Sequence, residues 1–277
     1  AATLRTAASP LPQGPARSAS HQADQGSVRR AKPISGQTIF RFDTFGDEQL
    51  WTNVLRMHEA IPSVNPVTAL AVGLKIDVDA LPPALIAALQ AGQVDLTNPA
   101  VTVELLRLNA VVGVRGQVSE TGQLTSVGIT CALCHSTVDD SFAPGIGKRL
   151  DGWANRDLNP GAIIALSPAV PENAKTVYSS WGPGKYDAYW NHDGKNDPTV
   201  IPPAYGLEGV ELETFTGEGP ISYWNAYVAV TQMHGQGSFS DSLLGIEIVA
   251  SPDLVTPKLA DLLAYQLSLP AATPPVG

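Results

Sequence analysis

The sequence predicts a mainly α-helical protein with long irregular loops and one β-hairpin. Several segments carry apolar residues at the spacing of an α-helix. The segment 109–130 instead alternates apolar and polar residues, which is typical of a β-hairpin. After position 135 the chain is rich in Gly, Pro, Asn and Asp for about a hundred residues, with one short helix predicted near Gly161–Leu166. We expect something to hold this stretch in place, because long loops without structure of their own are uncommon in compact domains.

Three helices are predicted before the hairpin. The first runs from about Asp47 to Ile61, where apolar side chains recur at helical spacing and a proline follows. The second lies in "VDALPPALIAALQAGQ", which has two prolines in its first turn and Gly92 at its end. The third lies in "TNPAVTVELLRL", where Asn98 is the predicted N-cap and a proline takes the first helical position.

The hairpin and a last helix complete the predicted elements. The hairpin turns around residues 119–123, between strands rich in β-branched residues, and leads directly to Cys131. The last helix lies in the leucine-rich segment "SPDLVTPKLADLLAYQLSLP". The long stretch between Cys131 and this helix is therefore predicted to be mostly irregular.

Composition divides the chain into three parts. Residues 1–38 form a basic low-complexity tail, residues 39–269 a single domain with insertions, and residues 270–277 a Pro-rich, linker-like end. The tail has five basic residues and one acidic residue. The rest of the chain therefore has 12 basic and 25 acidic residues, which gives it a net charge of −13. One interpretation is a solvated, disordered tail. The other is a tail that binds the acidic body or joins the chain to an oligomer or larger complex.

Bulk composition argues against two kinds of partner. The chain is 44% hydrophobic and 16% charged, as folded soluble proteins are. No apolar run approaches the roughly 20 residues that cross a bilayer, so we expect no membrane span. The net charge of −9 argues against nucleic-acid binding, which needs a positive surface to displace phosphate counterions.

The pentapeptide "CALCH" contains the chain's two cysteines, Cys131 and Cys134, and then His135. The spacing C-x-x-C-H is the attachment signal for c-type haem. A zinc site would need two more soft ligands, and no further cysteine is present. A thioredoxin-like dithiol would leave the histidine unexplained and lacks a surrounding βαβ pattern. A chance match with a structural disulfide or free buried thiols is the remaining alternative, and we predict one covalently attached haem c.

The haem c prediction also gives a compartment. Haem c is attached outside the cytoplasm in bacteria, and the chain opens "AATLRTAASP", without Met or a hydrophobic signal core. Such a start is typical of a mature chain after removal of a signal peptide. We therefore expect a periplasmic or extracellular protein.

His135 would supply the fifth iron ligand, and Met233 is the predicted sixth. Met233 stands beside His234 in the loop "VAVTQMHGQGSF". A thioether ligand raises the reduction potential of a haem, whereas a second histidine lowers it. His234 and His58 are therefore kept as alternatives to Met233, and ordinary core packing is the alternative role of the methionine itself.

Two residues after the motif are predicted to contact the haem. Arg149 is suited to a propionate, because guanidinium groups bind carboxylates in a bidentate manner. Trp153 lies among the basic residues of the same segment. The alternative for this segment is a solvated basic surface balanced by neighbouring aspartates.

The order of these features resembles class I c-type cytochromes, in which CxxCH comes first, a methionine follows on a loop, and a helix like the one ending in "AYQLSL" comes last. The segment "APGIGKRLDG", residues 143–152, resembles their post-haem loop, which implies that the Pro144 carbonyl accepts the Nδ1–H of His135. The resemblance implies a cytochrome c-like haem domain, here elaborated by a β-hairpin. The 98 positions from His135 to Met233 exceed the spacing in small cytochromes.

A second segment, residues 181–207, is similar to parts of the di-haem cytochrome c peroxidases and their rubber-oxygenase relatives. With a single CxxCH, this chain cannot by itself pass electrons between two haems.

The expected function is therefore a monohaem c-type cytochrome that exchanges single electrons with a redox partner protein, in a larger assembly and without a catalytic acid or base. A peroxidase- or oxygenase-type haem domain with an open or labile sixth position is the alternative, with His58 or His234 as general base. The third hypothesis is a non-enzymatic one, a structural haem subunit whose tail binds neighbouring chains.

Overall fold

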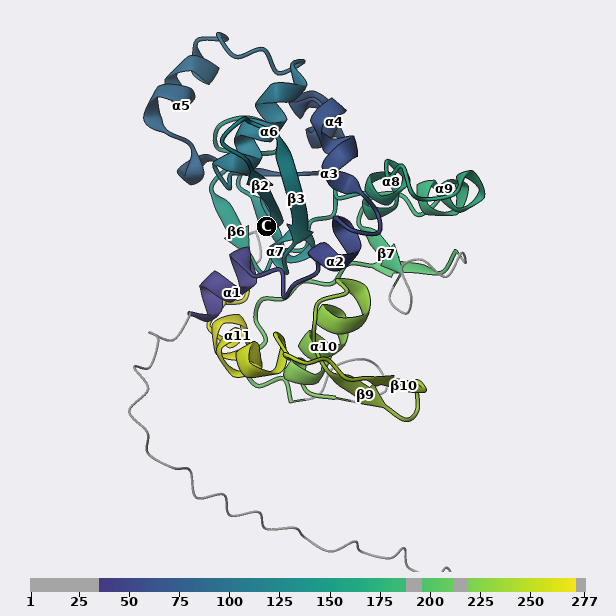
Figure 1. Ribbon diagram of the computed structural model, residues 1–277. Helices are drawn as coiled ribbons and strands as arrows, with labels where there is room; N and C mark the ends of the chain where they lie inside the picture. Colours follow the sequence, from purple (N-terminus) through teal and green to yellow (C-terminus); the bar gives the residue numbers. More distant parts are fainter. Residues whose placement is uncertain (1–34, 188–195, 212–218, 273–277) are drawn as a thin grey trace, which may run out of the picture. The chain divides into compact units, whose positions relative to one another are not determined.

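The computed structural model describes residues 35–187, 196–211 and 219–272. Most of the predicted tail (1–38) and of the predicted linker (270–277) lies outside the described residues, as does part of the peroxidase-like segment 181–207. The described residues belong to one compact unit. Its described helices and strands are drawn in Figure 1.

The prediction of a mainly α, cytochrome c-like fold is wrong. The described residues are about 39% helix and 16% strand, a mixed α/β composition. Their strands form five separate two-stranded sheets (Figure 1). Except for the predicted hairpin, each of these strands has only two or three residues. Such short strands show no readable alternation, so the sequence pattern presents them as irregular chain.

The first predicted helix is broken in two. Helix α2 spans Glu48–Trp51 and helix α3 spans Met57–Ala60, followed by a 3₁₀ turn at Ile61–Ser63. Between α2 and α3, Arg56 has φ +55°, a left-handed conformation that no right-handed helix can contain. The apolar spacing across 47–61 therefore belongs to two short helices, which bury Trp51 and Met57.

The next three helices all begin with a proline. They are α4 (Pro66–Ala71), α5 (Pro83–Gln90) and α6 (Pro99–Arg107). Proline suits this position, because the first N–H groups of a helix have no partner within it. The predicted N-cap Asn98 is confirmed, since its side-chain oxygen accepts the N–H of Ala100 at 3.0 Å.

The predicted hairpin is confirmed. Strands β2 (Val114–Val118) and β3 (Leu124–Ile129) pair in antiparallel fashion, and the N–H of Ser119 donates to the carbonyl of Gln123 across the turn. The hairpin packs against α2, α3 and α6. It ends next to helix α7, Ala132–His135, which contains most of the CALCH motif.

Small sheets and short helices hold the Gly/Pro-rich part of the chain. Helix α8 confirms the predicted short helix, and α10 continues into a π-helix that ends just before Met233. The helices are α8 (Pro160–Ala165), α9 (Glu172–Ser179), α10 (Ile221–Tyr227) and the π-helix Val228–Gln232. The strand pairs are β1 (Ile76–Asp77) with β5 (Ile146–Gly147), β4 (Ser136–Val138) with β6 (Arg149–Asp151), β7 (Lys185–Asp187) with β8 (Pro198–Val200), and β9 (Phe239–Asp241) with β10 (Ile246–Ile248).

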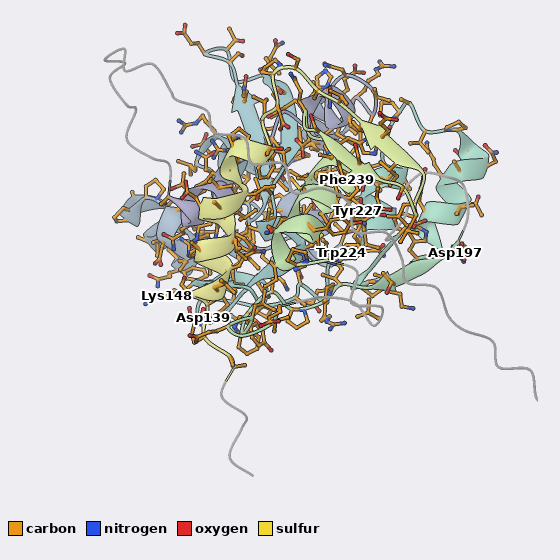
Figure 2. The ribbon with its side chains drawn as sticks, turned by 90° about the horizontal axis from the view of Figure 1, so that it is seen from below. Asp139, Lys148, Asp197, Trp224, Tyr227 and Phe239 are labelled. Carbon is orange, nitrogen blue, oxygen red and sulfur yellow. The ribbon has the colours of Figure 1, made fainter. Side chains whose placement is uncertain are left out.

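Aromatic side chains join α10 to β9. The rings of Trp224 and Tyr227 lie 5.4 Å apart, and those of Tyr227 and Phe239 lie 5.5 Å apart, both edge to face (Figure 2). Edge-to-face pairs of this kind place the positive edge of one ring on the negative face of the next. These ring contacts hold β9 against α10, the helix that continues into the π-helix before Met233.

The first and last described helices lock together. Helix α1 (Gly36–Phe42) packs on the predicted last helix, which is confirmed as α11 (Leu259–Leu267) (Figure 1). A Cβ on Gly36 would lie 1.9 Å from the carbonyl oxygen of Asp261, so only glycine allows this approach. The rings of Phe40 and Tyr265 meet edge to face at 5.6 Å.

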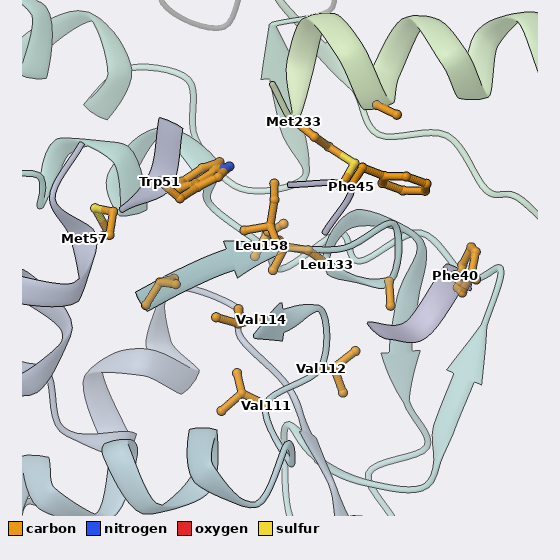
Figure 3. Close-up of a cluster of buried hydrophobic side chains, with 14 of the residues drawn as sticks. Phe40, Phe45, Trp51, Met57, Val111, Val112, Val114, Leu133, Leu158 and Met233 are labelled. Carbon is orange, nitrogen blue, oxygen red and sulfur yellow. The ribbon is translucent and has the colours of Figure 1, made fainter. Parts of the chain in front are cut away.

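One cluster of buried side chains runs through the described unit (Figure 3). It includes Phe45, Trp51, Leu133, Leu158 and Met233. Beside Leu133 the packing leaves an apolar cavity of about 70 Å³ between the hairpin and helices α3, α4 and α6. No helix among residues 35–187, 196–211 and 219–272 combines the length and the hydrophobicity that crossing a membrane requires.

Candidate functional site

One turn of helix places both cysteines and the histidine on one side. Cys131 is the N-cap of α7, and the N–H of His135 donates to its carbonyl at 3.1 Å. Residues three and four positions apart share a helix face, so Cys131, Cys134 and His135 project together. Ala132 and Leu133 lie on the buried side of the turn. The C-x-x-C-H spacing therefore produces a three-residue array from a single helical turn.

The two thiols are free and half-buried. Burial raises the pKa of Cys131 and of Cys134 to about 12. Redox-active dithiols and thiolate metal ligands need the opposite, a lowered thiol pKa. Within the described part of the chain, no group of three or more His, Cys, Asp or Glu side chains is arranged to hold a metal ion. Free thiols are also what a chance match to the motif would show.

His135 is oriented by a backbone carbonyl. Its Nδ1 atom lies 3.0 Å from the carbonyl oxygen of Pro202. A carbonyl oxygen can only accept, so Nδ1 carries the proton and Nε2 keeps its lone pair. Burial lowers the pKa of His135, and the hydrogen bond to Pro202 opposes this effect in part. The neutral ring therefore offers Nε2 as a ligand atom.

The role that resemblance gave to Pro144 belongs to Pro202. Pro144 lies inside a tight turn in which the backbone groups of Ala143 and Ile146 bond to each other. That turn holds Pro144 in its own local structure. The segment around Pro202 instead crosses the loop after the motif, where the N–H of Ala204 donates to the carbonyl of Gly152 at 2.7 Å.

Backbone hydrogen bonds also hold the end of α7. The N–H of Gly152 donates to the carbonyl of His135 at 2.7 Å, and that of Asn155 donates to the carbonyl of Cys134 at 2.9 Å. These carbonyls belong to the last turn of a helix, where no helical N–H remains to bind them. The loop after β6 therefore caps the turn that displays the cysteines and the histidine.

A buried carboxylate connects the motif to both terminal helices. Asp151 accepts hydrogen bonds from the hydroxyl of Ser136 at 2.8 Å, from Nε of Arg41 at 2.5 Å and from the hydroxyl of Tyr265 at 2.5 Å. Burial, followed by the contact with Asp151, raises the pKa of Tyr265 to about 12. Ser136 directly follows His135, so this network fixes the strand that leaves the site. Neither Asp151 nor Pro202 carried a sequence signal for this role.

Arg149 is buried and paired with Asp77, but one of its N–H donor groups, Nη1, has no partner among the described residues. Its side chain is only 2% exposed, its Nε donates to Asp77 at 3.1 Å, and its guanidinium lies over the ring of Phe42. Its Nη1 has no hydrogen-bond partner among the described residues. Burial lowers the pKa of Arg149, and the nearby Asp77 and Asp151 oppose this. A carboxylate ligand would satisfy the remaining donor.

Trp153 lies at the surface and not inside the array. Its side chain is 42% exposed, and its ring lies 5.2 Å from that of Tyr205. Tyr205 belongs to the same segment as Pro202, whose carbonyl holds His135. The predicted contact of Trp153 with a haem stays a prediction.

Met233 points inward, while His234 lies nearer the surface. Met233 is 4% exposed and belongs to the same buried cluster as Leu133 of the motif (Figure 3). Its N–H donates to the carbonyl of Val228 at 2.9 Å, which closes the π-helix. His234 is half-buried and has φ +62°, and its carbonyl accepts from Gln49.

His58 lies on the short helix α3, with its Nε2 3.8 Å from a carboxylate oxygen of Glu59. The preceding residue, Met57, is the one that faces the core, at 2% exposure. His58 is half-buried, with its side chain 25% exposed and its Nδ1 atom buried.

The site combines the motif with residues far from it in sequence. The structure brings Cys131, Cys134 and His135 together and ties them to Pro202 and Asp151. No protein-family model, curated protein or solved structure matches this chain. The geometry of these residues therefore carries the functional proposal.

Proposed function

We propose that this chain is a monohaem c-type cytochrome that carries single electrons outside the cytoplasm. The observation that carries the proposal is the array on α7, in which two thiols and a fixed imidazole project from one helical turn. A histidine that binds a metal through one nitrogen almost always donates its other ring N–H to a carbonyl or carboxylate. The bond from His135 to Pro202 is of this kind.

The residues of the site fit haem c. The thiols of Cys131 and Cys134 would hold the haem through covalent thioether links. Nε2 of His135 and the thioether of Met233 would be the two protein ligands of the iron. The spare Nη1 donor of Arg149 would bind a propionate. When bound, haem c supplies a one-electron iron centre.

Electron transfer requires no catalytic acid or base from the chain itself. Burial favours the neutral form of His135 by lowering its pKa, and the hydrogen bond from its Nδ1–H to the carbonyl of Pro202 keeps the ring oriented. The buried cluster around Leu133 and Met233 would exclude water from the cofactor, which raises the reduction potential of a centre whose net charge falls on reduction. The mixed α/β framework would carry the cofactor on loops pinned by small sheets. Export, a redox partner protein and assembly through residues 1–38 belong to the same proposal.

Attachment is tested by expressing the chain in a bacterial periplasm together with haem c maturation enzymes. We expect the mass to rise by one haem that stays bound in denaturant, and expect Cys131→Ser/Cys134→Ser to abolish this increase. Thr121→Ala, at an exposed position of the hairpin turn, serves as a control that keeps both thiols. A chain that acquires no covalent haem under these conditions would contradict the proposal.

The sixth ligand separates a carrier from an enzyme. We expect the oxidised protein to show the weak red absorption band of a methionine–iron bond, and expect Met233→Ala to remove it. Met57→Ala is the matched control, because Met57 is equally buried but lies on α3. A high-spin spectrum that changes at once with cyanide or peroxide would instead support the peroxidase- or oxygenase-type alternative.

A further inference from the structure

We propose that the surface formed by Trp153, Pro202, Pro203 and Tyr205 is the docking site for a redox protein whose own surface is basic. We refer to these four residues as the aromatic–proline surface. The inference rests on the proposed electron-carrier function and names the place where the electron enters or leaves.

The aromatic–proline surface has the composition of a protein interface. Trp153, Pro202 and Pro203 are exposed, and Tyr205 is half-buried beneath the Trp153 ring, with the ring planes inclined at 44°. Tryptophan and tyrosine are enriched at the centres of interfaces, because they bury a large area at little entropic cost. An exposed tryptophan held by a second ring is a pre-organised contact of this kind.

Short connections lead from this surface to His135. The carbonyl oxygen of exposed Pro202 lies 3.0 Å from Nδ1 of the imidazole, so one hydrogen bond joins the surface to the ring. A second connection runs from Trp153 through the N–H of the preceding Gly152 to the carbonyl of His135 at 2.7 Å. Electrons tunnel more readily through covalent bonds and short hydrogen bonds than across gaps, so both connections favour transfer here.

Charge indicates which kind of protein would dock. Residues 39–277 carry a net charge of −13, and the exposed Glu208 and Glu211 follow the 202–206 segment directly. Arg156, also exposed, is the basic residue closest along the chain to Trp153. An acidic body steers basic partners toward it and repels a second copy of itself. The occupant is therefore a basic one-electron protein and not another copy of this chain.

The transfer is balanced without protons. One electron leaves the reduced centre of the partner, which is thereby oxidised, and the haem of this chain is reduced by the same electron. The reverse direction uses the same surface. No bond of the aromatic–proline surface forms or breaks in either direction.

The test uses the haem-loaded chain and mitochondrial cytochrome c as a basic protein probe, with hexacyanoferrate as a small probe. In stopped-flow experiments we expect Trp153→Ala/Tyr205→Ala to slow electron exchange with the protein about tenfold, equivalent to about 1.4 kcal/mol, and to leave the hexacyanoferrate rate unchanged. Raising the salt concentration should also slow exchange with the protein. Leu243→Ala is the control, because Leu243 is 81% exposed on the β9–β10 turn.

A binding measurement provides a readout apart from electron transfer. Cytochrome c with zinc in place of iron should shift the backbone NMR signals of residues 152–153 and 202–206, and Trp153→Phe should keep the shifts. Unchanged exchange rates in the double variant, or shifts confined to other surfaces, would overturn this inference alone. A chain that takes up no haem would overturn the proposed function and this inference with it.

Discussion

The Nδ1 atom of His135 lies 3.0 Å from the carbonyl oxygen of Pro202, 67 positions later in the chain. This contact fixes both the orientation and the tautomer of the imidazole, because only a protonated Nδ1 can donate to a carbonyl. It also joins the CALCH motif to a segment at the protein surface.

The haem-free chain should hold His135 as the neutral Nδ1–H tautomer. Nitrogen-15 NMR of the histidine rings distinguishes the two tautomers by the shifts of the protonated and unprotonated nitrogens. His58, which has a carboxylate and not a carbonyl as its neighbour, serves as an internal comparison. A dominant Nε2–H tautomer at His135 would contradict the orientation described here.

Asp151→Asn should lower the free energy of unfolding by about 3 kcal/mol. The change removes a carboxylate that is 3% exposed and leaves Arg41 without its ion-pair partner, a loss typical of broken buried pairs. Chemical denaturation of the haem-free chain measures it. Glu104→Gln, which breaks an exposed pair with Arg107, should leave the stability nearly unchanged. Equal losses of unfolding free energy in the two variants would show that the Asp151 network contributes no more to stability than an exposed ion pair does.

Gly36→Ala should destabilise the contact between the first and last helices. The new Cβ would lie 1.9 Å from the carbonyl oxygen of Asp261 and 2.7 Å from Cβ of Tyr265, so the helices must separate. Overpacking of this kind costs about 3 kcal/mol, which thermal unfolding would detect as a lower midpoint. Thr38→Ala, at an exposed position on the same helix, provides the control. An unchanged midpoint for Gly36→Ala would mean that α1 and α11 do not pack as described.

Stability should fall in acid because of Asp253. Burial alone would raise the pKa of Asp253, but hydrogen bonds from Thr256 and Val255 outweigh it and lower the pKa to about 2. The unfolded chain has the ordinary value of about 3.9, so the folded state binds fewer protons between these two values. The stabilisation is therefore complete above pH 4 and is lost as the pH falls toward 2.

Denaturation at a series of pH values measures this effect. Asp253→Asn should flatten the decline in unfolding free energy between pH 4 and pH 2, whereas Glu211→Gln, at an exposed position, should not. Asp253 also accepts the N–H of Ser238 in the segment that follows Met233. A pH profile unaffected by Asp253→Asn would show that other carboxyl groups control unfolding in acid.

Local sequence signals predicted those elements whose stabilising groups lie close together in the chain. The N-cap at Asn98, the hairpin around residues 119–123 and the leucine-rich last helix are all formed by interactions within a few residues. The first helix was predicted wrongly because apolar spacing does not reveal a left-handed residue such as Arg56. The fold class was wrong because strands of two or three residues show no readable alternation, and in one pair, β1 with β5, the partner strand also lies far away in the sequence.

By itself, the sequence determined the spacing of Cys131, Cys134 and His135, the acidic character of the body and the order of the motif before Met233. Those properties depend on residue identity and on spacing within one turn. Only the tertiary structure decided that Pro202 holds His135 and that Asp151 connects Arg41 and Tyr265, which lie 110 and 114 positions away. Such contacts join a backbone carbonyl or a common side chain to a distant segment, and local periodicity carries no information about where distant segments meet.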